Sequence, residues 1–428
     1  MFKKAMCIIL SLVFVCSVAL FAVPVTTFAE ENTIEFSGGD GSEGNPYKVA
    51  TAAHLNNVRD YLTSHFIQIA DIDLTAATAI GGDYFNNGQG WKPIGEDLDS
   101  GYPFSGTYNG DGHIILGMKI DIAGEAVGLF GYSEGTIKNL GMVDGNVRNY
   151  AFSYAYAYVG GIVGYNDGTM YNCYNSSSVS SSAIFTGGVT GINRGTMNNC
   201  YNSGSVSSSA AFTGGVAGIS DGIISNCYNT ATVSAEYTVM PSSSVGGIAG
   251  ANSGTLITCY NIGSSFSSIF DSSSTAGGIT GANPGGVIAN CYTINTGYSG
   301  DYGTILTLEQ MKLQQSFVGF DFDDVWSINS NKNNGLPYLN GMIKNPAKIL
   351  SYDGTTLKVY SKYDYAGAAV WIAAYDEGRL ADAKQITATL TANETTTIPL
   401  TFEHSTGIKI FIWKSDSSME PICEAWQQ

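Results

Sequence analysis

The 428-residue chain has few charged residues, and few basic ones in particular. Lysine and arginine number 19 against 36 aspartate and glutamate residues, so the formal net charge is −17 at pH 7. A surface of this sign repels phosphate backbones, so we do not expect nucleic acid as a partner. Only 13% of the residues are charged, whereas Gly (53) and Tyr (26) are abundant. This composition disfavours helices and favours β-structure with many turns.

The residues of the common metal and cofactor motifs are also scarce. The four histidines do not form a His-Glu-x-x-His zinc site, and the eight cysteines contain no Cys-x-x-Cys pair. A phosphate-binding Gly-Lys-Ser/Thr sequence is missing as well. We therefore predict neither a cofactor nor a bound metal. The histidines are His54, His65, His113 and His404.

One long apolar run occurs, and it lies at the N-terminus. Lys3 and Lys4 precede an apolar stretch from Ile8 to Val23, and Thr27 and Ala29 suit cleavage after Ala29. This pattern predicts a secretory signal peptide at residues 1–29. Because no second apolar span of about 20 residues follows, we expect no membrane insertion after cleavage.

Paired glycines and single cysteines recur along the middle of the chain. The distance from each pair to its cysteine stays nearly constant, and the length varies in the Ser-rich stretch that follows. A fixed period of this size is typical of a solenoid. The pairs begin at Gly160, Gly187, Gly214, Gly246 and Gly277, and the cysteines are Cys173, Cys200, Cys227, Cys259 and Cys291.

Each unit contains three strand-like pieces, such as "GGVTGI", "TMNNCYN" and "GSVSSS". Short turns such as "NRG" separate them, and we expect positive φ at these corners because Gly and Asn tolerate it. One unit then forms one coil of a parallel β-helix, and neighbouring coils lie about 4.8 Å apart. Equivalent side chains must stack from coil to coil. The expected stacks are the five cysteines, an internal apolar row (Met170, Met197, Ile224, Leu256, Ile288) and an Asn ladder (Asn175, Asn202, Asn229, Asn261).

The sequence motifs of these units resemble GLUG-motif repeats, which occur in secreted and surface proteins of bacteria. The matching segments are "GGIVGYNDGTMYNCYN" with its copies and "GLFGYSEGTIKNLGM". The resemblance extends over about residues 45–340 because it includes the flanking segments "NPYKVATAAHLNNVRDYL", "WKPIG" and "FDFDDVWSINSNKNNGLPYL". It implies a β-helical, adhesin-like surface protein, and the family has no agreed catalytic residues.

The ends of the repeat region have a different character. Thr51 to Leu62 is predicted to be a short amphipathic capping helix, and "TLEQMKLQQ" from Thr307 contains a capping-box pattern. The last residues alternate as strands do, which predicts a small β-sandwich that resembles accessory domains of clostridial-type secreted proteins. The fold class is thus all-β. The predicted segments are 1–29 (signal peptide), 30–126 (cap and first coils), 127–300 (GLUG-type β-helix), 301–346 (C-terminal cap) and 347–428 (β-sandwich).

Two rows of repeat residues are candidate sites. We expect the cysteine row to be a reduced, buried structural stack; disulfides between neighbours would need distortion from parallel geometry. A tyrosine follows each cysteine, and strand alternation directs it outward. Such an aromatic stripe could bind glycan or protein, although a ladder that only supports itself is an alternative. The stripe consists of Tyr174, Tyr201, Tyr228, Tyr260 and Tyr292.

Acidic residues do not form a recognisable catalytic or calcium site. Asp71, Asp73 and Asp83 are too few for the oxygen ligands that calcium needs. Between Tyr154 and Gly300 the coils carry only Asp167, Arg194, Asp221, Glu236 and Asp271, with Asp301 at the border, which is too sparse for a catalytic cleft. The N-terminal segment is richer, with Glu96, Asp97, Asp99, Asp111 and Glu125.

Together these patterns predict a secreted or cell-surface, monomeric, non-enzymatic protein that binds an extracellular glycan or a host or surface protein through the solenoid face. Two alternatives stay open. One is a polysaccharide-degrading lyase or glycosidase with its site in the N-terminal coils, and the other is a structural spacer that binds nothing. A groove with two carboxylates about 5–9 Å apart would favour the enzyme.

Overall fold

A computed structural model describes residues 36–427, apart from the gaps given at the end of this paragraph. The predicted signal peptide lies outside the described residues. Within the described part, no helix is both long enough and apolar enough to cross a bilayer. The gaps are 96–100, 151–155, 210, 236–242, 268–273, 295–301, 331–332, 341–346, 362–364, 377–378, 392–393, 404–406, 416–417 and 422–425.

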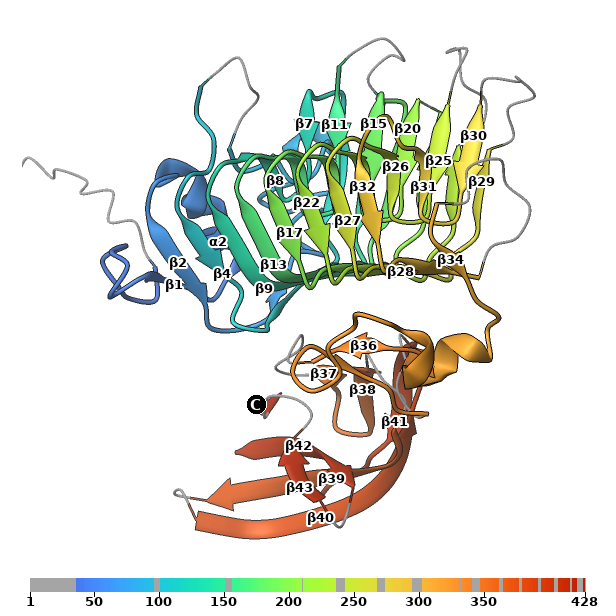
Figure 1. The fold of residues 1–428 in the computed structure, drawn as a ribbon. Coiled ribbons are helices and arrows are strands. Elements are labelled where there is room, and N and C mark those ends of the chain that lie inside the picture. Colours follow the sequence, from blue (N-terminus) through green and yellow to red (C-terminus); the bar gives the residue numbers. More distant parts are fainter. Residues whose placement is uncertain are drawn as a thin grey trace, which may run out of the picture. The chain divides into compact units, whose positions relative to one another are not determined.

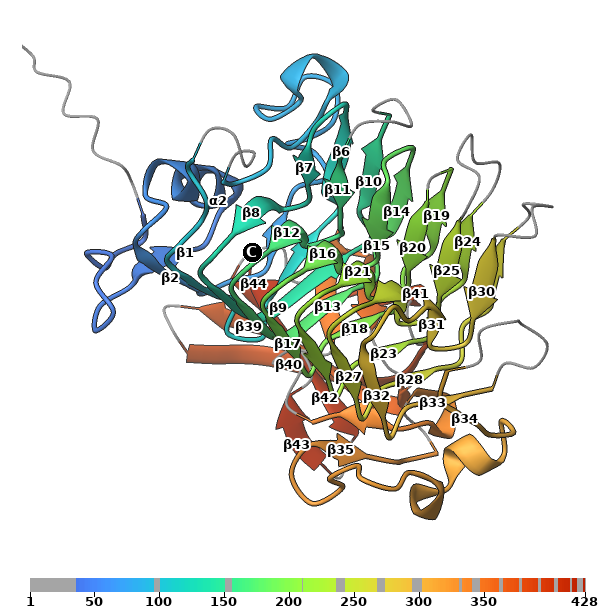
Figure 2. The ribbon, with the colours of Figure 1, turned by 45° about the horizontal axis from the view of Figure 1, so that its top comes forward.

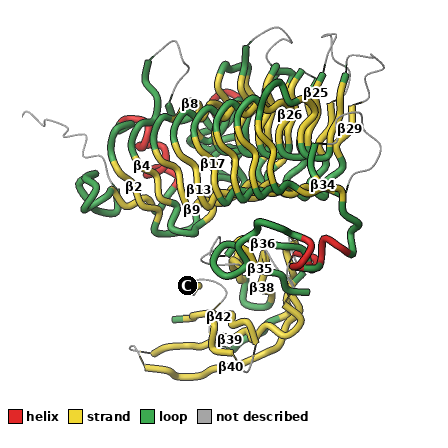
Figure 3. The backbone as a smooth tube through the Cα atoms, viewed as in Figure 1, coloured by secondary structure: helices red, strands yellow, loops and turns green. Residues whose placement is uncertain are grey.

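A parallel β-solenoid forms the larger part of the chain, which confirms the predicted β-helix (Figures 1 and 3). Each full coil contributes strands to four sheets, named here walls 1 to 4 in the order in which the chain visits them. Wall 1 contains β7 (Ala126–Val127), β11 (Tyr158–Val159), β15 (Phe185–Gly187), β20 (Phe212–Gly214), β25 (Ser244–Gly246) and β30 (Thr275–Gly277). Wall 2 contains β8 (Phe130–Ser133), β12 (Val163–Asn166), β16 (Thr190–Asn193), β21 (Ala217–Ser220), β26 (Ala249–Asn252) and β31 (Thr280–Ala282).

Wall 3 is the long sheet and continues into the N-terminal coils. It contains β1 (Tyr47–Val49), β2 (His65–Gln68), β3 (Ile72–Asp73), β4 (Thr107–Asn109), β5 (Ile114–Leu116), β9 (Thr136–Val143), β13 (Thr169–Asn175), β17 (Thr196–Asn198), β18 (Tyr201–Asn202), β22 (Ile223–Ser225), β23 (Tyr228–Asn229), β27 (Thr255–Ile257), β28 (Tyr260–Asn261), β32 (Val287–Ala289), β33 (Tyr292–Thr293) and β34 (Thr304–Ile305). Wall 4 contains β6 (Lys119–Ile122), β10 (Asn146–Asn149), β14 (Ser178–Ser181), β19 (Val206–Ser208), β24 (Val233–Ala235) and β29 (Ser265–Ser267).

The register between coils is the one that the repeat predicts. Met170 pairs with Met197, Met197 with Ile224, and Ile224 with Leu256, and the first four members of this row are fully buried. Like residues therefore lie over like residues along the core. The Asn row forms the predicted ladder, because the Nδ2 of Asn175, Asn202 and Asn229 donates to Oδ1 of the next Asn at 2.9–3.1 Å.

The corners of each coil differ from the expectation in one respect. Positive φ does not occur at the "NRG" turn, where Gly195 is required because a Cβ would overlap the carbonyl oxygen of Gly168 in the neighbouring coil. It occurs one residue before each cysteine, at Asn199 (φ 55°) and its counterparts. This left-handed residue divides the predicted strand "TMNNCYN" into β17 and β18. Asn is one of the few residues that adopt this conformation at low cost.

Short caps and a second domain flank the coils. The predicted first helix is α2 (Ala52–Asn57), continued by the 3₁₀ turn η1 (Val58–Asp60), and Thr51 Oγ1 accepts a hydrogen bond from His54 N at 3.2 Å. Further 3₁₀ turns are η2 (Asn86–Gly88), η3 (Gln310–Lys312), η4 (Gln314–Ser316) and η5 (Asn333–Gly335), and β35 (Trp326–Ser327) pairs with β36 (Tyr338–Leu339). The capping box is present at η3, since Thr307 and Gln310 exchange side chain-to-backbone hydrogen bonds of 2.8 and 3.2 Å.

The C-terminal strands form two antiparallel sheets that share one apolar core, as a β-sandwich does. The resemblance to clostridial-type accessory domains stays a prediction. One sheet contains β37 (Ala347–Tyr352), β38 (Thr356–Ser361) and β41 (Glu394–Pro399); the other contains β39 (Tyr365–Asp376), β40 (Arg379–Leu390), β42 (Ile408–Ser415), β43 (Ser418–Pro421) and β44 (Trp426–Gln427).

Candidate functional site

The repeat cysteines lie inside the solenoid core. Cys173, Cys200, Cys227, Cys259 and Cys291 are at most 2% exposed and are free thiols. Each Sγ donates to the carbonyl oxygen two residues earlier, at 3.1–3.4 Å, across the left-handed corner residue. Burial raises the pKa of the Cys173 and Cys227 thiols. A buried thiol with a raised pKa is a poor nucleophile, so this geometry describes a packing element.

The repeat tyrosines form a ladder on the opposite side of wall 3. Successive rings of Tyr174, Tyr201, Tyr228 and Tyr260 are 4.6–4.9 Å apart and within 7° of parallel. They point away from the solenoid core, as alternation predicts. The expectation of an accessible face is nevertheless wrong, because all five rings, including that of Tyr292, are at most 5% exposed.

The chain between β34 and the sandwich covers this ladder. The Trp326 ring lies 6.0 Å from the ring of Tyr228 and 5.9 Å from that of Tyr260. The Tyr260 hydroxyl donates to the Pro337 carbonyl at 2.6 Å and accepts from Asn333 Nδ2 at 2.8 Å. These contacts bury the hydroxyl of Tyr260 as well as the rings of Tyr228 and Tyr260. The other apolar residues of this cover segment in the same cluster are Met311, Phe317, Phe320, Leu336 and Leu339.

A second aromatic row lies on wall 1, two residues before each glycine pair. Tyr158, Phe185 and Phe212 occupy this position in consecutive coils and are in register. Their rings stack with centroids 5.2 and 5.6 Å apart and planes 6° and 11° from parallel. All three are half-buried, so part of each ring meets solvent. This row was not predicted from the sequence, although it recurs with the same period as the Tyr174 row.

Buried side chains at the neighbouring positions on wall 2 pack against the first ring of this row. Tyr132, Tyr165 and Ile192 form a cluster separate from the core, and Tyr158 and Ile219 pack against it. The Tyr165 ring meets the ring of Tyr158 edge-on at 5.1 Å. We name Tyr158, Phe185 and Phe212 with this cluster the outer aromatic strip. Its strands follow one another along walls 1 and 2 in Figure 2.

Charged side chains flank the strip: the Tyr132 hydroxyl donates to Glu134 Oε1 at 2.7 Å, and the Glu125 carboxylate helps to raise the pKa of Tyr158. Arg194 lies 5.4 Å from the Tyr165 ring centroid and 3.6 Å from the carboxylate of Asp221, so it is a paired side chain at the border. Burial raises the pKa of the Tyr158 and Tyr165 hydroxyls, and nearby Arg194 lowers both by a smaller amount. The phenols therefore stay neutral at physiological pH, and the half-buried Tyr158 hydroxyl offers a hydrogen-bond donor, whereas Tyr165 is only 3% exposed.

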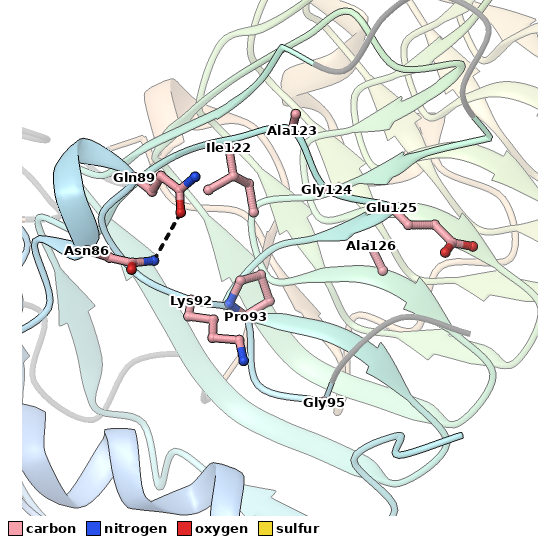
Figure 4. Close-up of a pocket in the computed structure, with 10 residues that line it drawn as sticks. All are labelled: Asn86, Gln89, Lys92, Pro93, Gly95, Ile122, Ala123, Gly124, Glu125 and Ala126. Carbon is pink, nitrogen blue, oxygen red and sulfur yellow. Dashed lines mark hydrogen bonds between the residues drawn. The ribbon is translucent and has the colours of Figure 1, made fainter. Parts of the chain in front are cut away.

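A pocket of about 550 Å³ opens near the N-terminal end of the strip (Figure 4). Ala126 belongs to its lining and pairs in register with Tyr158 of the next coil. Three segments form it: the η2 turn, the "WKPIG" segment and the turn before β7. Its described lining residues are Asn86, Gln89, Lys92, Pro93, Gly95, Ile122, Ala123, Gly124, Glu125 and Ala126.

Two of the remaining acidic candidates, Asp71 and Asp73, have structural partners. Asp71 Oδ1 lies 3.1 Å from His113 Nδ1 and accepts from Ile114 N at 3.0 Å, and Asp73 Oδ1 accepts from Thr75 N at 2.9 Å. Among the described residues, no group of three or more His, Cys, Asp or Glu side chains could hold a metal ion. Glu96, Asp97, Asp99, Glu236, Asp271 and Asp301 lie outside the described residues.

Two segments, "GYSEG" and "GISDG", match the Gly-x-Ser-x-Gly pattern of serine hydrolases. Their serines, Ser133 and Ser220, are fully buried and end wall 2 strands. A nucleophile elbow requires a strand, a sharp turn and a helix, with the hydroxyl exposed above the sheet. The match is therefore a property of the repeat.

Comparisons with known proteins agree with this geometry. The family model for the GLUG motif matches residues 155–180. A protein of Bacteroides ovatus, solved as a "putative immunoglobulin A1 protease", aligns with a TM-score of 0.53 and 23% identity over 71% of this chain and 95% of its own. The class is therefore a parallel β-solenoid. Within that class, the chain carries a GLUG motif in its coils, and its repeats fit a GLUG-repeat β-helix protein.

Two curated relatives match a part of the chain. One, from Evansella cellulosilytica, is named "Putative Gly-rich membrane protein" and is 35% identical over 164 residues, which are 37% of this chain and 18% of the relative. The other, halomucin from Haloquadratum walsbyi, is 31% identical over 167 residues, which are 37% of this chain and 2% of the relative. The chain thus spans less than a fifth of the length of either relative.

Proposed function

We propose that this protein acts outside the cell or at the cell surface and binds an extended glycan along the outer aromatic strip. The location is supported by the predicted signal peptide, by the GLUG repeat and by the names of the two relatives, a membrane protein and a mucin. The ligand class is supported by the strip itself, which takes the role that the sequence had suggested for the buried tyrosine ladder.

The proposal rests mainly on the row of half-buried aromatic rings, which contains one ring in each of three consecutive coils. The spacings of 5.2 and 5.6 Å between Tyr158, Phe185 and Phe212 repeat along the solenoid, so they suit a polymer whose units also repeat. The rings are held by their neighbours, and little side-chain entropy is lost on binding. Within the row each ring covers the face of the next. The residues in register beyond its ends, Ala126 and Ser244, are too small to cover a ring, so the two end faces suit stacking against sugar C–H groups.

The experiment compares binding and hydrolysis of the same polysaccharides by the full chain. A panel of xyloglucan, galactomannan, laminarin and polygalacturonate is tested for retention and for released reducing ends. We expect binding without hydrolysis, and at least a tenfold weaker Kd, about 1.4 kcal/mol, for the Phe185→Ala/Phe212→Ala double variant. Tyr150→Ala removes an aromatic side chain that is 46% exposed outside the strip and serves as the control.

Other outcomes would support the alternatives. Hydrolysis of a glycan would favour the enzyme; Glu125 is the one carboxylate among the ten lining residues in Figure 4, and the neighbouring acidic segment 96–100 lies outside the described residues. Binding of a surface protein instead of any glycan would favour a protein ligand. Binding of neither a glycan nor a protein would favour the alternative of a structural spacer, in which the stacked side-chain ladders only support the fold. An unchanged Kd in the strip variant would contradict the proposal directly.

A further inference from the structure

The pocket beside the strip adds a polar site to an otherwise apolar face. Lys92 and Glu125 belong to different segments of its lining, and Pro93, Ile122 and Ala126 supply apolar surface. Its volume of about 550 Å³ lies in the range of small-molecule sites. Figure 4 shows the Lys92 and Glu125 side chains on either side of the Pro93 and Ala126 positions.

Both sides of the pocket are held by hydrogen bonds to their backbones. Arg59 donates through Nη2 to the Lys92 carbonyl at 3.0 Å and through Nη1 to the Pro93 carbonyl at 3.4 Å, and its guanidinium lies 5.2 Å from the Trp91 ring centroid. On the other side, the Glu125 carbonyl accepts from Tyr158 N at 2.7 Å. The pocket is therefore preorganised, which lowers the entropy cost of binding.

The buried residue Asn149 secures the second side further. It is 1% exposed, and its Nδ2 donates to the Gly124 carbonyl at 2.8 Å. The turn that carries Glu125 is thus fixed both to wall 4, through Asn149, and to wall 1, through Tyr158.

We infer that this pocket binds a neutral pyranose unit of the glycan, with Lys92 and Glu125 hydrogen-bonding to its hydroxyl groups. Hydroxyls both donate and accept, so one ligand can satisfy an ammonium donor and a carboxylate acceptor at once. Pro93, Ile122 and Ala126 pack against the apolar C–H groups of the sugar. The net charge of −17 disfavours a polyanionic glycan at this surface.

The pocket and the strip then form one continuous binding path. Ala126 is shared, because it belongs to the pocket lining and pairs with Tyr158, the first ring of the row. A unit in the pocket is followed by units that lie along the rings. This inference rests on the proposed function, and it adds the sugar class and the residues that select it.

The test measures affinity of the full chain by calorimetry with the neutral polysaccharide of the panel that binds best, and with polygalacturonate as the anionic probe. Glu125→Gln and Lys92→Met remove one charge each from half-buried or exposed positions, so both variants should fold, and melting temperatures check this. We expect each to weaken binding at least tenfold. The matched controls Glu394→Gln and Lys358→Met, at exposed sandwich positions, should leave Kd unchanged.

Three results would overturn the inference. Tighter binding of polygalacturonate than of the neutral glycans would contradict the sugar class. Unchanged affinity in both pocket variants, with weaker binding in Phe185→Ala/Phe212→Ala, would remove the pocket and leave the proposed function standing. Failure of the unmodified protein to bind any glycan would remove both.

Discussion

Replacing Asn202 by alanine tests whether the Asn ladder stabilises the solenoid. Asn202 is fully buried and makes four hydrogen bonds. Its Nδ2 donates to the Gly204 carbonyl at 2.7 Å and to Asn229 Oδ1 at 2.9 Å, and its Oδ1 accepts from Asn175 Nδ2 at 3.1 Å and from Gly204 N at 3.3 Å. The substitution leaves four buried polar groups, each short of one partner.

The expected loss follows from these four bonds. A typical hydrogen bond contributes about 1 kcal/mol net, and a buried group left without its partner costs about 1–3 kcal/mol. We therefore expect the free energy of unfolding to fall by about 4 kcal/mol in Asn202→Ala. The cost would be smaller only if water enters the space and replaces some of the bonds.

The assay is urea unfolding of the full chain, followed by far-UV circular dichroism and tryptophan fluorescence in parallel. Two probes are needed because a solenoid joined to a sandwich need not unfold in one step. Asn146→Ala, at an exposed position of β10, is the matched control and should change stability by less than about 0.5 kcal/mol. A loss below about 1 kcal/mol in Asn202→Ala would refute the reasoning.

A double-mutant cycle then isolates the coil-to-coil bond. Asn202 and Asn229 share one hydrogen bond of 2.9 Å, so the double alanine variant loses it once instead of twice. The summed single losses should exceed the double loss by about 1 kcal/mol. Strict additivity would mean that the ladder does not act between coils.

Three further perturbations have defined outcomes. Thr258 has φ 51° where other coils have Asn, so Thr258→Asn should raise stability by about 1 kcal/mol in the same urea assay, and a loss would contradict the conformational argument. Trp326→Ala empties a fully buried site over the tyrosine ladder and should cost about 3–5 kcal/mol, measured with Leu308→Ala, 46% exposed, as control. Burial raises the pKa of Tyr260 above its ordinary value of about 10, so the folded state holds this proton more tightly than the unfolded chain. Stability should be independent of this group below pH 10 and fall above it by up to about 1.4 kcal/mol per pH unit. Tyr260→Phe should make that decline shallower in melting curves between pH 9 and 12, and an equal slope would argue against the assignment.

The period of the sequence predicts contacts between coils well, because each such contact joins equivalent residues of neighbouring repeats. Met170 over Met197 and Asn175 over Asn202 follow from spacing alone. Inward and outward alternation also holds, since Cys200 lies in the core and Tyr201 on the other side of wall 3. These features depend only on local geometry repeated at a constant interval.

The exposure of an outward residue could not be predicted in the same way. Tyr201 points outward yet is 3% exposed, whereas Phe185, also outward, is half-buried. The difference comes from the non-repeating cover segment, whose Trp326 packs on the tyrosine ladder. Where such a segment docks is a matter of tertiary packing, and no period in the coils encodes it.

The glycine pairs and the Asn ladder explain each other. A Cβ at Gly188 would overlap the side-chain amide of Asn202, and one at Gly215 would overlap that of Asn229, so the second glycine of a pair provides space for the asparagine of its own coil. Packing therefore constrains the residue types in the motifs "GG" and "CYN", which recur with little change. The wall 1 position two residues before the pair is under no such constraint and changes from Tyr158 through Phe212 to Ser244. Because the solenoid tolerates these changes, residues at this position can vary without loss of the fold, and this supports the proposal that the outer aromatic strip binds the ligand.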